Sequence, residues 1–568
     1  MRRPVKLSNS KKRQLNSLLD QAVQSLNQGR AEVAAQLCQR MESIQPGFGD
    51  AINIRGIIAS QQGDSDAALG LFQQAVAAAP RRYEFHLNLA GMLLQGDRHA
   101  QALQSYRQAL KLKPHELQIQ LAYAGALIAM RQFDQAGELL MTAYKRHPRN
   151  TELLMKLFRA CYERGDTAQA EGWLQELIGL NPDHVDAHYC YALLLLQDGR
   201  RQQGEQEIRT TLRLDPDHAD AEGLLFEIGA RRERDADVEQ LAAMFERAPA
   251  DSPQRARLGF VYGKALGDLG EYDAAFRCYA EGNAIRSRAA CYDQARELSR
   301  LQQIMQRFTP AAMEETSGLS DASPIFIVGM PRCGSTLVEQ ILVSHPDVTP
   351  RGECGFFEDA MRQCDADITS TELTPQQWQA VAQQYLQLLQ ADAGEDEPSG
   401  SGRRYTDKSL SNISMIGAIH CALPEARIIH VRRHPMDTCW SIFHNHLQGS
   451  HFDYGHDLET LGYYYRAYLQ LMQHWRASLP AGALFEIDYE ELVADQQTQT
   501  RRLLEACGLA WHEQCLRFYE AANAVRTASF MQVRKPVSSG SVGVWKHYER
   551  QLQPLLRILG DAAHPPVS

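Results

Sequence analysis

The residues best suited to chemistry follow a short apolar stretch near the middle of this sequence. Residues 325–328 (Ile-Phe-Ile-Val) predict a buried strand, and residues 329–336 (Gly-Met-Pro-Arg-Cys-Gly-Ser-Thr) turn from it into a predicted helix. Backbone N–H groups and the helix dipole favour an anion at such a junction. Gly329 and Gly334 have the spacing of a P-loop, but its lysine is missing and Arg332 stands earlier in the turn. The segment therefore predicts a cradle for a phosphate-like group, without the full equipment for hydrolysing a nucleoside triphosphate.

A second segment has residues suited to binding another phosphate. Residues 427–431 (Arg-Ile-Ile-His-Val) predict a buried strand, and residues 438–447 predict the helix that follows. Arg433 stands at the end of the strand and Ser441 stands on the helix. A guanidinium group and a hydroxyl group placed in this way can hold one phosphate together.

These two segments require a framework of strands and helices that positions them. Residues 484–493 predict a further strand that leads into a helix, and residues 316–323 are polar, which is typical of a domain boundary. The sequence therefore predicts an α/β domain with a parallel, P-loop-like sheet over residues 322–568. Residues 231–321 are predicted to be an irregular helical segment that contains one further repeat and a linker.

Three series of residues recur every 34 positions in residues 1–230. Proline ends helices, small residues let helices approach closely, and glycine suits tight turns. This period and these residue types are typical of tetratricopeptide repeats, so we predict an all-α solenoid of about six helix–turn–helix units. The three series are Pro46, Pro80, Pro114, Pro148, Pro182 and Pro216; Ala34, Ala68, Ala102, Ala136, Ala170 and Gly204; and Gly29, Gly63, Asp97, Arg131, Gly165 and Gly199.

Such a solenoid presents a concave groove, for which the interpretation we favour is the docking of a peptide or protein partner. The alternative is a spacer or a surface for self-association, including a homo-oligomer. The sequence does not identify a ligand for the groove.

The overall composition excludes some classes of function. The chain has 568 residues and a net charge of −10, which argues against a general binder of nucleic acid or membrane surfaces. No apolar run approaches the roughly 20 residues that span a bilayer, and the basic N-terminus is not followed by the apolar segment of a signal peptide. The 12 cysteines form no Cys-x-x-Cys pair, which is typical of a reducing compartment. A cytoplasmic location without a membrane span is expected.

Together, the two phosphate-binding segments resemble the donor site of sulfotransferases. Residues 331–336 are similar to the 5′-phosphosulfate loop of that family, and Arg433 with Ser441 is similar to its 3′-phosphate motif. The resemblance extends over residues 322 to about 550. Repeats joined to this domain resemble a bacterial family of tetratricopeptide-repeat sulfotransferases, and the catalytic part is most similar in pattern to tyrosylprotein sulfotransferases.

The resemblance implies a sulfotransferase that uses 3′-phosphoadenosine 5′-phosphosulfate (PAPS) as co-substrate and needs no metal. Transfer to the acceptor hydroxyl would occur in line. The catalytic residues that it implies are Glu353 as general base, Lys408 at the leaving group, Arg332 and Ser529. The residues implied to bind the nucleotide are Arg332, Cys333, Gly334, Ser335, Thr336, Arg433, Ser441, Tyr489, Arg534, Lys535, Trp545 and Lys546.

The sequence departs from the family pattern at two positions. Cys333 stands where the family usually has serine. Lys546 follows Trp545, as in small-molecule sulfotransferases, whereas in tyrosylprotein enzymes the lysine precedes the tryptophan. A protein tyrosine, a saccharide and a small molecule therefore all stay open as acceptors.

Other functions of the same residues stay open at this point. A P-loop kinase or nucleotidase would bind ATP with Mg²⁺, but it requires the lysine that the loop lacks. A nucleotide-binding scaffold whose repeats recruit a protein partner without turnover is the principal alternative. The spacings of His444, His446, His451 and His456 do not match a zinc site, and no metal is expected.

Overall fold

The computed structural model describes residues 8–96, 98–314, 318–321, 323–369, 373–391, 403–520 and 535–563. Contacts within the chain divide it into two compact units, Met1–Ala187 and His188–Ser568. The boundary falls inside helix α11 (Val185–Gln197). Within the described residues, none of the helices combines the length and the apolar character needed to cross a bilayer.

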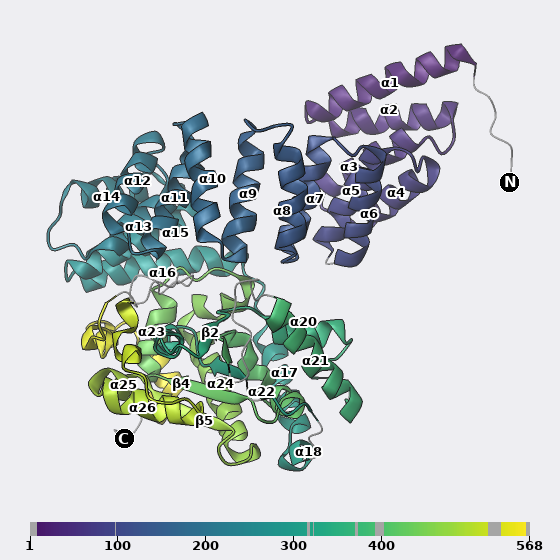
Figure 1. Ribbon diagram of the computed structural model, residues 1–568. Coiled ribbons are helices and arrows are strands. Elements are labelled where there is room, and N and C mark those ends of the chain that lie inside the picture. The colour runs from purple at the N-terminus through teal and green to yellow at the C-terminus, as the bar shows by residue number, and fades with distance from the viewer. Residues whose placement is uncertain are drawn as a thin grey trace. The chain divides into compact units, whose positions relative to one another are not determined.

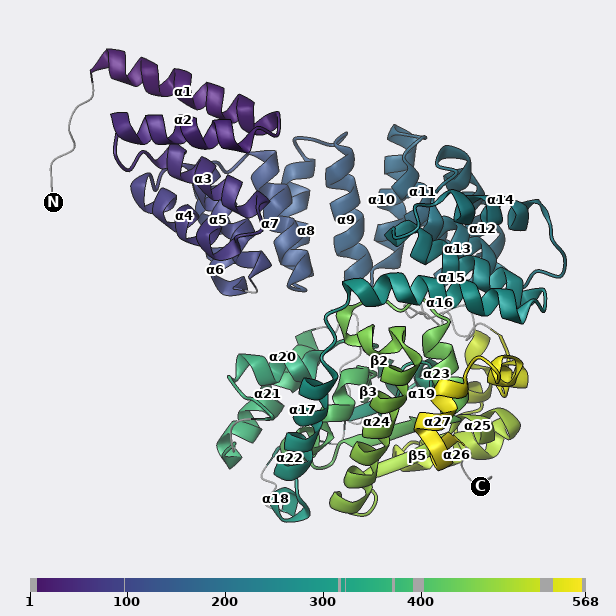
Figure 2. The same cartoon turned by 180° about the vertical axis from the view of Figure 1, so that it is seen from behind.

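The first unit is a succession of helices in which each packs on the next along the chain (Figures 1 and 2). Short turns join the helices in pairs, as expected for a helix–turn–helix repeat. The helices are α1 (Asn9–Asn27), α2 (Ala31–Ile44), α3 (Gly49–Gln61), α4 (Ser65–Ala78), α5 (Tyr83–Gln95), α6 (His99–Leu112), α7 (Leu117–Ala129), α8 (Phe133–Tyr144), α9 (Thr151–Arg164) and α10 (Thr167–Leu180).

The three periodic series have the structural roles that the sequence predicts. The prolines follow the ends of the even-numbered helices from α2 to α12. The five alanines of the small-residue series are fully buried, and a Cβ atom on Gly204 would lie 2.7 Å from the Leu196 side chain. The turn series has positive φ angles at Gly29 (72°), Gly63 (82°), Arg131 (58°), Gly165 (103°) and Gly199 (79°), while Asp97 lies outside the described residues. The predicted tetratricopeptide solenoid is confirmed.

The second unit begins with further helices and ends with an α/β domain. The helices that precede the sheet are α12 (Arg201–Leu214), α13 (Ala219–Ile228), α14 (Ala236–Arg247), α15 (Pro253–Asp268), α16 (Tyr272–Ala289), α17 (Gln294–Arg307) and α18 (Pro310–Glu314). Three glycines allow α15 and α16 to pack closely. A Cβ atom on Gly259, Gly263 or Gly282 would lie within 3.0 Å of atoms of the facing helix.

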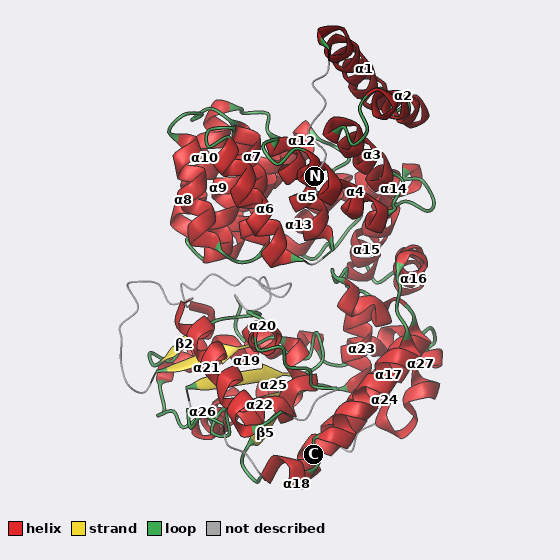
Figure 3. Cartoon of the chain, turned by 90° about the vertical axis from the view of Figure 1, so that its right-hand side faces the viewer, coloured by secondary structure: helices red, strands yellow, loops and turns green. Residues whose placement is uncertain are grey.

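The α/β domain contains a parallel sheet with the strand order β2-β3-β1-β4-β5 among the described residues (Figure 3). The predicted α/β fold class is therefore confirmed. Its elements, with η denoting 3₁₀ helices, are β1 (Pro324–Val328), α19 (Ser335–Val343), β2 (Val348–Pro350), α20 (Phe356–Gln363), α21 (Pro375–Ala391), β3 (Arg404–Asp407), η1 (Leu410–Met415), α22 (Ile416–Ala422), β4 (Arg427–Arg432), α23 (Pro435–Phe443), η2 (Ser450–His456), α24 (Leu458–Ser478), β5 (Leu484–Asp488), α25 (Tyr489–Ala494), α26 (Gln496–Ala506), η3 (Glu513–Glu520), η4 (Ser539–Ser541), η5 (Val544–Tyr548), α27 (Gln553–Leu559) and η6 (Gly560–Ala563).

Alternate residues of the central strands face two different apolar layers. Ile325 and Ile327 of β1 pack in a cluster with α19 and α26. Phe326 points to the other face, where its ring centroid lies 6.0 Å from that of Phe357 and 5.4 Å from that of Tyr385. Both faces of β1 are therefore buried, as expected for the central strand of a parallel sheet.

Replacing Gly263 with alanine tests the close packing of α15 on α16. The added Cβ atom would lie 2.7 Å from the ring of Tyr279, which is itself buried. We expect Gly263→Ala to lower the free energy of unfolding by roughly 1–3 kcal/mol in urea denaturation.

Gly172→Ala is the matched control, because a Cβ atom on this helical glycine of α10 meets nothing within 4 Å. This change should be neutral or stabilising by up to about 1 kcal/mol. Equal effects of the two substitutions would contradict the packing described for Gly263.

Candidate functional site

The candidate site lies where the order of the strands reverses. After β1 the chain passes to β2 and β3 on one side of it, and then to β4 and β5 on the other side. The loops that follow β1 and β4 therefore leave the carboxyl ends of two neighbouring parallel strands and open a crevice between them. Open α/β sheets bind their ligands at this position.

The loop after β1 has a backbone that few side chains allow. Arg332 adopts a positive φ of 67°, and Gly334 has a φ of 102°. A Cβ atom on Gly334 would lie 2.5 Å from the ring of Tyr489, and one on Gly329 would lie 2.7 Å from the carbonyl oxygen of Val431. The two glycines thus let the loop pack against β4 and α25 at the crevice.

The loop ends at the N-terminus of α19. Gly334 precedes the helix and offers no capping side chain, and Ser335 and Thr336 form its first two positions. Both of these residues are buried. The first N–H groups of a helix and its positive dipole end favour an anion. This part of the structure can therefore hold a phosphate or sulfate group.

Two arginines from the separate sequence segments meet in the crevice. Arg332 Nε donates a hydrogen bond to Ser441 Oγ at 3.2 Å. Arg433 Nη1 donates to the carbonyl oxygen of Arg332 at 2.8 Å, and its Nη2 donates to the carbonyl oxygen of Ser541 at 2.6 Å. The structure thus brings Arg332, Arg433 and Ser441 together.

Tyr489 completes this cluster. Its ring centroid lies 5.0 Å from the guanidinium carbon of Arg433, and its hydroxyl group lies 2.6 Å from Ser541 Oγ. Ser541 was missed by the sequence analysis, because a serine in a Ser- and Gly-rich segment resembles an ordinary loop residue. Its position just before Trp545, itself a predicted site residue, is the signal that could have indicated it.

The charges of the crevice favour an anionic ligand. Burial and the nearby charge of Arg433 lower the pKa of Arg332 to about 10, which leaves it ionised at neutral pH. The charge of Glu227, on α13, opposes this lowering of the Arg332 pKa. Burial raises the pKa of Glu227 itself. The two guanidinium groups therefore give the crevice its attraction for an anion.

A second cluster lies at the carboxyl ends of β2 and β3. Lys408 directly follows β3 and is fully buried, and its Nζ donates a hydrogen bond to Glu353 Oε1 at 2.6 Å. The Glu353 side chain, in the loop after β2, is 56% exposed. The structure therefore pairs the predicted base with the predicted lysine, and of the two only the carboxylate reaches solvent.

Glu339 of α19 is a further carboxylate beside Lys408. It is buried, and Thr406 Oγ1 donates a hydrogen bond to its Oε1 at 3.1 Å. Burial raises the pKa of Glu339, and the charge of Lys408 opposes that shift. The sequence analysis missed this residue, although a glutamate inside the apolar stretch of residues 337–343 indicates a buried charge.

Cys333 lies within electrostatic reach of both clusters. Its side chain is buried, and burial raises the pKa of its thiol to about 11. The charges of Arg433 and Lys408 both oppose this shift. Cys333, which stands where the related loops usually have serine, therefore lies near the charges of Arg433 and Lys408.

Trp545 anchors the segment that follows Ser541. The backbone N–H of Trp545 donates to Asp437 Oδ1 at 3.2 Å, and the N–H of Gly543 donates to Asp437 Oδ2 at 2.6 Å. The indole ring of Trp545 stacks on the ring of His434 with a centroid distance of 5.8 Å. The buried indole thus fixes this segment on the N-terminus of α23. This contact holds Ser541 near Arg433.

Two further predicted site residues lie at the surface. Lys535 and Lys546 are exposed. Ser529 and Arg534 lie outside the described residues.

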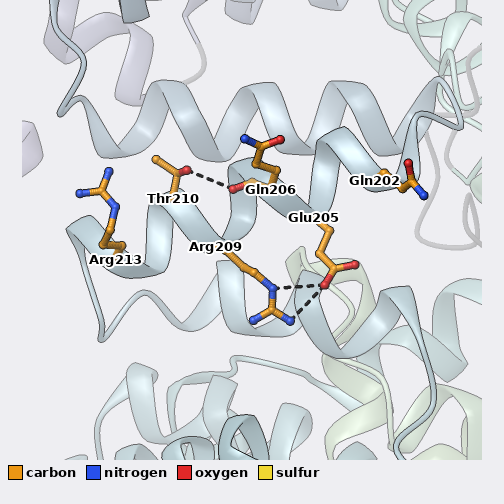
Figure 4. A pocket seen from close by; sticks show the side chains of 6 residues that line it. All are labelled: Gln202, Glu205, Gln206, Arg209, Thr210 and Arg213. Carbon is orange, nitrogen blue, oxygen red and sulfur yellow. Dashed lines mark hydrogen bonds and ion pairs between the residues drawn. The ribbon is translucent and has the colours of Figure 1, made fainter.

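A hollow of about 450 Å³ elsewhere in the second unit lacks the features of a catalytic site. All six of its lining side chains come from α12 (Figure 4). Arg209 is paired with Glu205 at 3.0 Å, and Thr210 Oγ1 donates to the carbonyl oxygen of Gln206. We therefore place the candidate site at the sheet.

Comparisons with known proteins agree with both parts of the chain. Residues 324–513 match the sulfotransferase family, and residues 55–116, 93–143 and 124–292 match tetratricopeptide repeats. The chain thus carries tetratricopeptide repeats and a sulfotransferase family domain, as the sequence analysis predicts.

Two curated relatives match about half of the chain. An uncharacterized protein of Aquifex aeolicus is 30% identical over 343 residues, which cover 58% of this chain and 44% of the relative. The protein-tyrosine sulfotransferase of Drosophila melanogaster is 23% identical over 316 residues, which cover 48% of this chain and 59% of the relative. The chain therefore spans about half the length of these relatives.

Solved structures also match parts of the chain. They include pilF of Pseudomonas aeruginosa, with a TM-score of 0.34, 15% identity and coverage of 39% of this chain and 100% of pilF. The tetratricopeptide protein YrrB matches with a TM-score of 0.29, 14% identity and coverage of 33% of this chain and 96% of YrrB.

The burial of Cys333 predicts a slow reaction with iodoacetamide at neutral pH. Alkylation requires the thiolate, and the raised pKa together with the lack of exposure suppresses it. Cys291, which is exposed, should be alkylated first. Peptide mass spectrometry of the native protein measures the order, and labelling of Cys333 as fast as Cys291 would contradict this description.

Proposed function

We propose that this protein is a sulfotransferase that transfers a sulfuryl group from PAPS to an acceptor hydroxyl group. The observation that carries the proposal is the convergence of Arg332, Arg433 and Ser441 at the carboxyl ends of β1 and β4. A donor with one phosphate at its 3′ position and a phosphosulfate at its 5′ position requires two anion sites in one crevice. The guanidinium cluster and the N-terminus of α19 are suited to these two roles.

In this proposal Arg433 and Ser441 bind the 3′-phosphate. Ser335, Thr336 and the backbone of the loop at Cys333 and Gly334 bind the phosphosulfate. Arg332 contacts Ser441, so we propose that its guanidinium lies between the two anionic ends and serves both.

Other residues complete the nucleotide pocket in this proposal. Tyr489 and Trp545 line this pocket. The ring of Tyr489 lies against the guanidinium group of Arg433, and the backbone N–H of Trp545 donates to Asp437 of α23. Ser541 positions Tyr489 and Arg433 through its hydroxyl group and its carbonyl oxygen. Lys535, Lys546 and Arg534 would add positive charge around the nucleotide.

Glu353 and Lys408 would act on the transferred group. Glu353 removes the proton of the acceptor hydroxyl, whose oxygen forms a new bond to sulfur. The bond from sulfur to the bridging oxygen breaks, and its electron pair stays on the 5′-phosphate of the nucleotide product. Lys408 neutralises the charge that develops on that oxygen, and Ser529 is the further hydroxyl that we assign to the same centre. A positioned base contributes ~10²–10⁴-fold to such a rate.

We propose that the repeats bind a protein or peptide that carries or delivers the acceptor. Tetratricopeptide repeats are suited to protein binding, and the Drosophila relative is a protein-tyrosine sulfotransferase by name. A saccharide or a small-molecule hydroxyl group is the competing acceptor class. We also propose a cytoplasmic location, because the cysteines are free and include no Cys-x-x-Cys pair.

The direct test is to incubate the full chain with radiolabelled PAPS and a cell extract, and to identify the labelled species by mass. Transfer of label to a hydroxyl group is the expected result, and the labelled species identifies the acceptor class. Nucleotide binding without transfer to any acceptor would favour the scaffold that recruits a partner without turnover.

Arg433 tests the recognition of the 3′-phosphate. We expect 3′-phosphoadenosine 5′-phosphate (PAP) to bind at least about tenfold more tightly than AMP, because charge-assisted hydrogen bonds to the extra phosphate are strong. Arg433→Ala should remove most of this preference in isothermal titration calorimetry. Arg432→Ala is the matched control, because Arg432 is paired with Asp488. Equal affinities of the native protein for PAP and AMP would contradict the assignment.

Glu353 tests the chemical step. We expect Glu353→Gln to lower kcat by ~10²–10⁴-fold, because the amide cannot accept the proton. The affinity for PAP should stay within about twofold of the native value. Glu358→Gln at the start of α20 is the control, since Glu358 is exposed and is paired only loosely with Arg362 at 3.7 Å. Transfer of label at the native rate by Glu353→Gln would assign the base to another residue.

A further inference from the structure

Helix α16 packs directly against α23, the helix that carries Ser441 (Figures 1 and 3). The ring of Phe276 lies 6.2 Å from Trp440 and 5.8 Å from Phe443, centroid to centroid, and the ring of Tyr279 lies 5.7 Å from Trp440. These residues of α16 recur with helical spacing, so one continuous face of the helix meets α23.

The same face supplies a hydrogen bond to the end of α23. Asn283, which is 2% exposed, donates from Nδ2 to the carbonyl oxygen of Phe443 at 2.7 Å. One turn further along α16, Arg286 donates to the carbonyl oxygen of Leu447. The last carbonyl groups of a helix have no partner within it, and Asn283 provides one for Phe443, the last residue of α23.

The carbonyl group that Asn283 caps lies two residues from Ser441. Ser441 Oγ accepts the hydrogen bond from Arg332, and Asn445, just beyond the helix end, donates from Nδ2 to the carbonyl oxygen of Ser441 at 2.7 Å. The position of the Ser441 hydroxyl group therefore depends on how the last turn of α23 ends. Asn283 contributes one of the contacts that hold that end, and it does so from outside the α/β domain.

We infer that Asn283 is a positioning residue of the donor site, which fixes the last turn of α23 so that Ser441 can bind the 3′-phosphate. This inference rests on the proposed function. It makes the α15–α16 hairpin a required part of the nucleotide site, although the hairpin precedes the sheet by more than thirty residues. The hydrogen bond of Asn283 goes to the backbone of α23, so Asn283 acts through that helix.

Asn283→Asp tests this role with almost no change in shape. The carboxylate cannot donate to the Phe443 carbonyl oxygen and repels it. We expect the affinity for PAP to fall by about tenfold and the affinity for AMP to stay within about twofold of the native value. The KM for PAPS should rise, while kcat at saturating donor should change little. A merely structural defect would weaken PAP and AMP alike.

Two further variants make the result decisive. Ala284→Asp places the same charge on the next, exposed residue of α16 and should change neither affinity. Asn283→Ala removes the donor without adding a charge and should weaken PAP selectively by a smaller factor, so it decides the question if Asn283→Asp does not fold. In the background of Ser441→Ala, Asn283→Asp should add little further loss, because both changes affect the same contact.

The outcomes separate this inference from the proposed function. A native protein that binds PAP no better than AMP would overturn the proposed function itself. A native protein that prefers PAP, with the same preference in Asn283→Asp and Asn283→Ala, would overturn the role of Asn283 alone. Full additivity of Asn283→Asp and Ser441→Ala would also overturn it.

Discussion

The candidate site depends on holding two guanidinium groups together in a partly buried crevice. Arg332 and Arg433 repel each other, and like charges interact more strongly where protein replaces water. The structure stabilises the pair through the face of Tyr489, the Ser441 hydroxyl group and the Ser541 carbonyl oxygen. An anion between the two cations would remove the repulsion. The free energy of this repulsion therefore contributes to the binding of a doubly anionic ligand.

The elements around this pair follow from the same requirement. Gly334 has no side chain because Tyr489 must approach the loop closely to stack beside Arg433. Asp437 receives two backbone N–H groups from residues 543–545, and this contact brings Ser541 to the crevice. The loop at Arg332 and the segment at Ser541 are more than two hundred residues apart in the sequence. Both meet at Arg433, which donates a hydrogen bond to a carbonyl oxygen of each.

Local patterns predicted much of this arrangement. The strands β1, β4 and β5 coincide with apolar runs, and the 34-residue period predicted the paired helices because each unit repeats the same turn and packing. The short strands β2 and β3 were not predicted. They have only three and four residues, and they lack the apolar run that marks β1.

Contacts made by single side chains could not be predicted in the same way. Ser541 and Asn283 are ordinary polar residues in their local sequence, and their roles arise from partners more than one hundred positions away. The contact of Arg332 with Ser441 likewise needs the three-dimensional arrangement, since the sequence assigns these residues to different anions. Residues 231–321 were predicted to contain one further repeat and a linker, but nothing in their sequence indicates that a side chain of this segment caps α23.

The close fit of α16 on α23 also constrains how this protein can evolve. Repeat arrays commonly change length by gaining or losing whole units, because each unit contacts only its neighbours. Replacing the α15–α16 hairpin with another repeat would remove the contacts of Phe276, Tyr279 and Asn283 with α23. Gains and losses of repeats are therefore best tolerated on the N-terminal side of α13, because Glu227 of α13 supplies the charge that opposes Arg332 at the crevice.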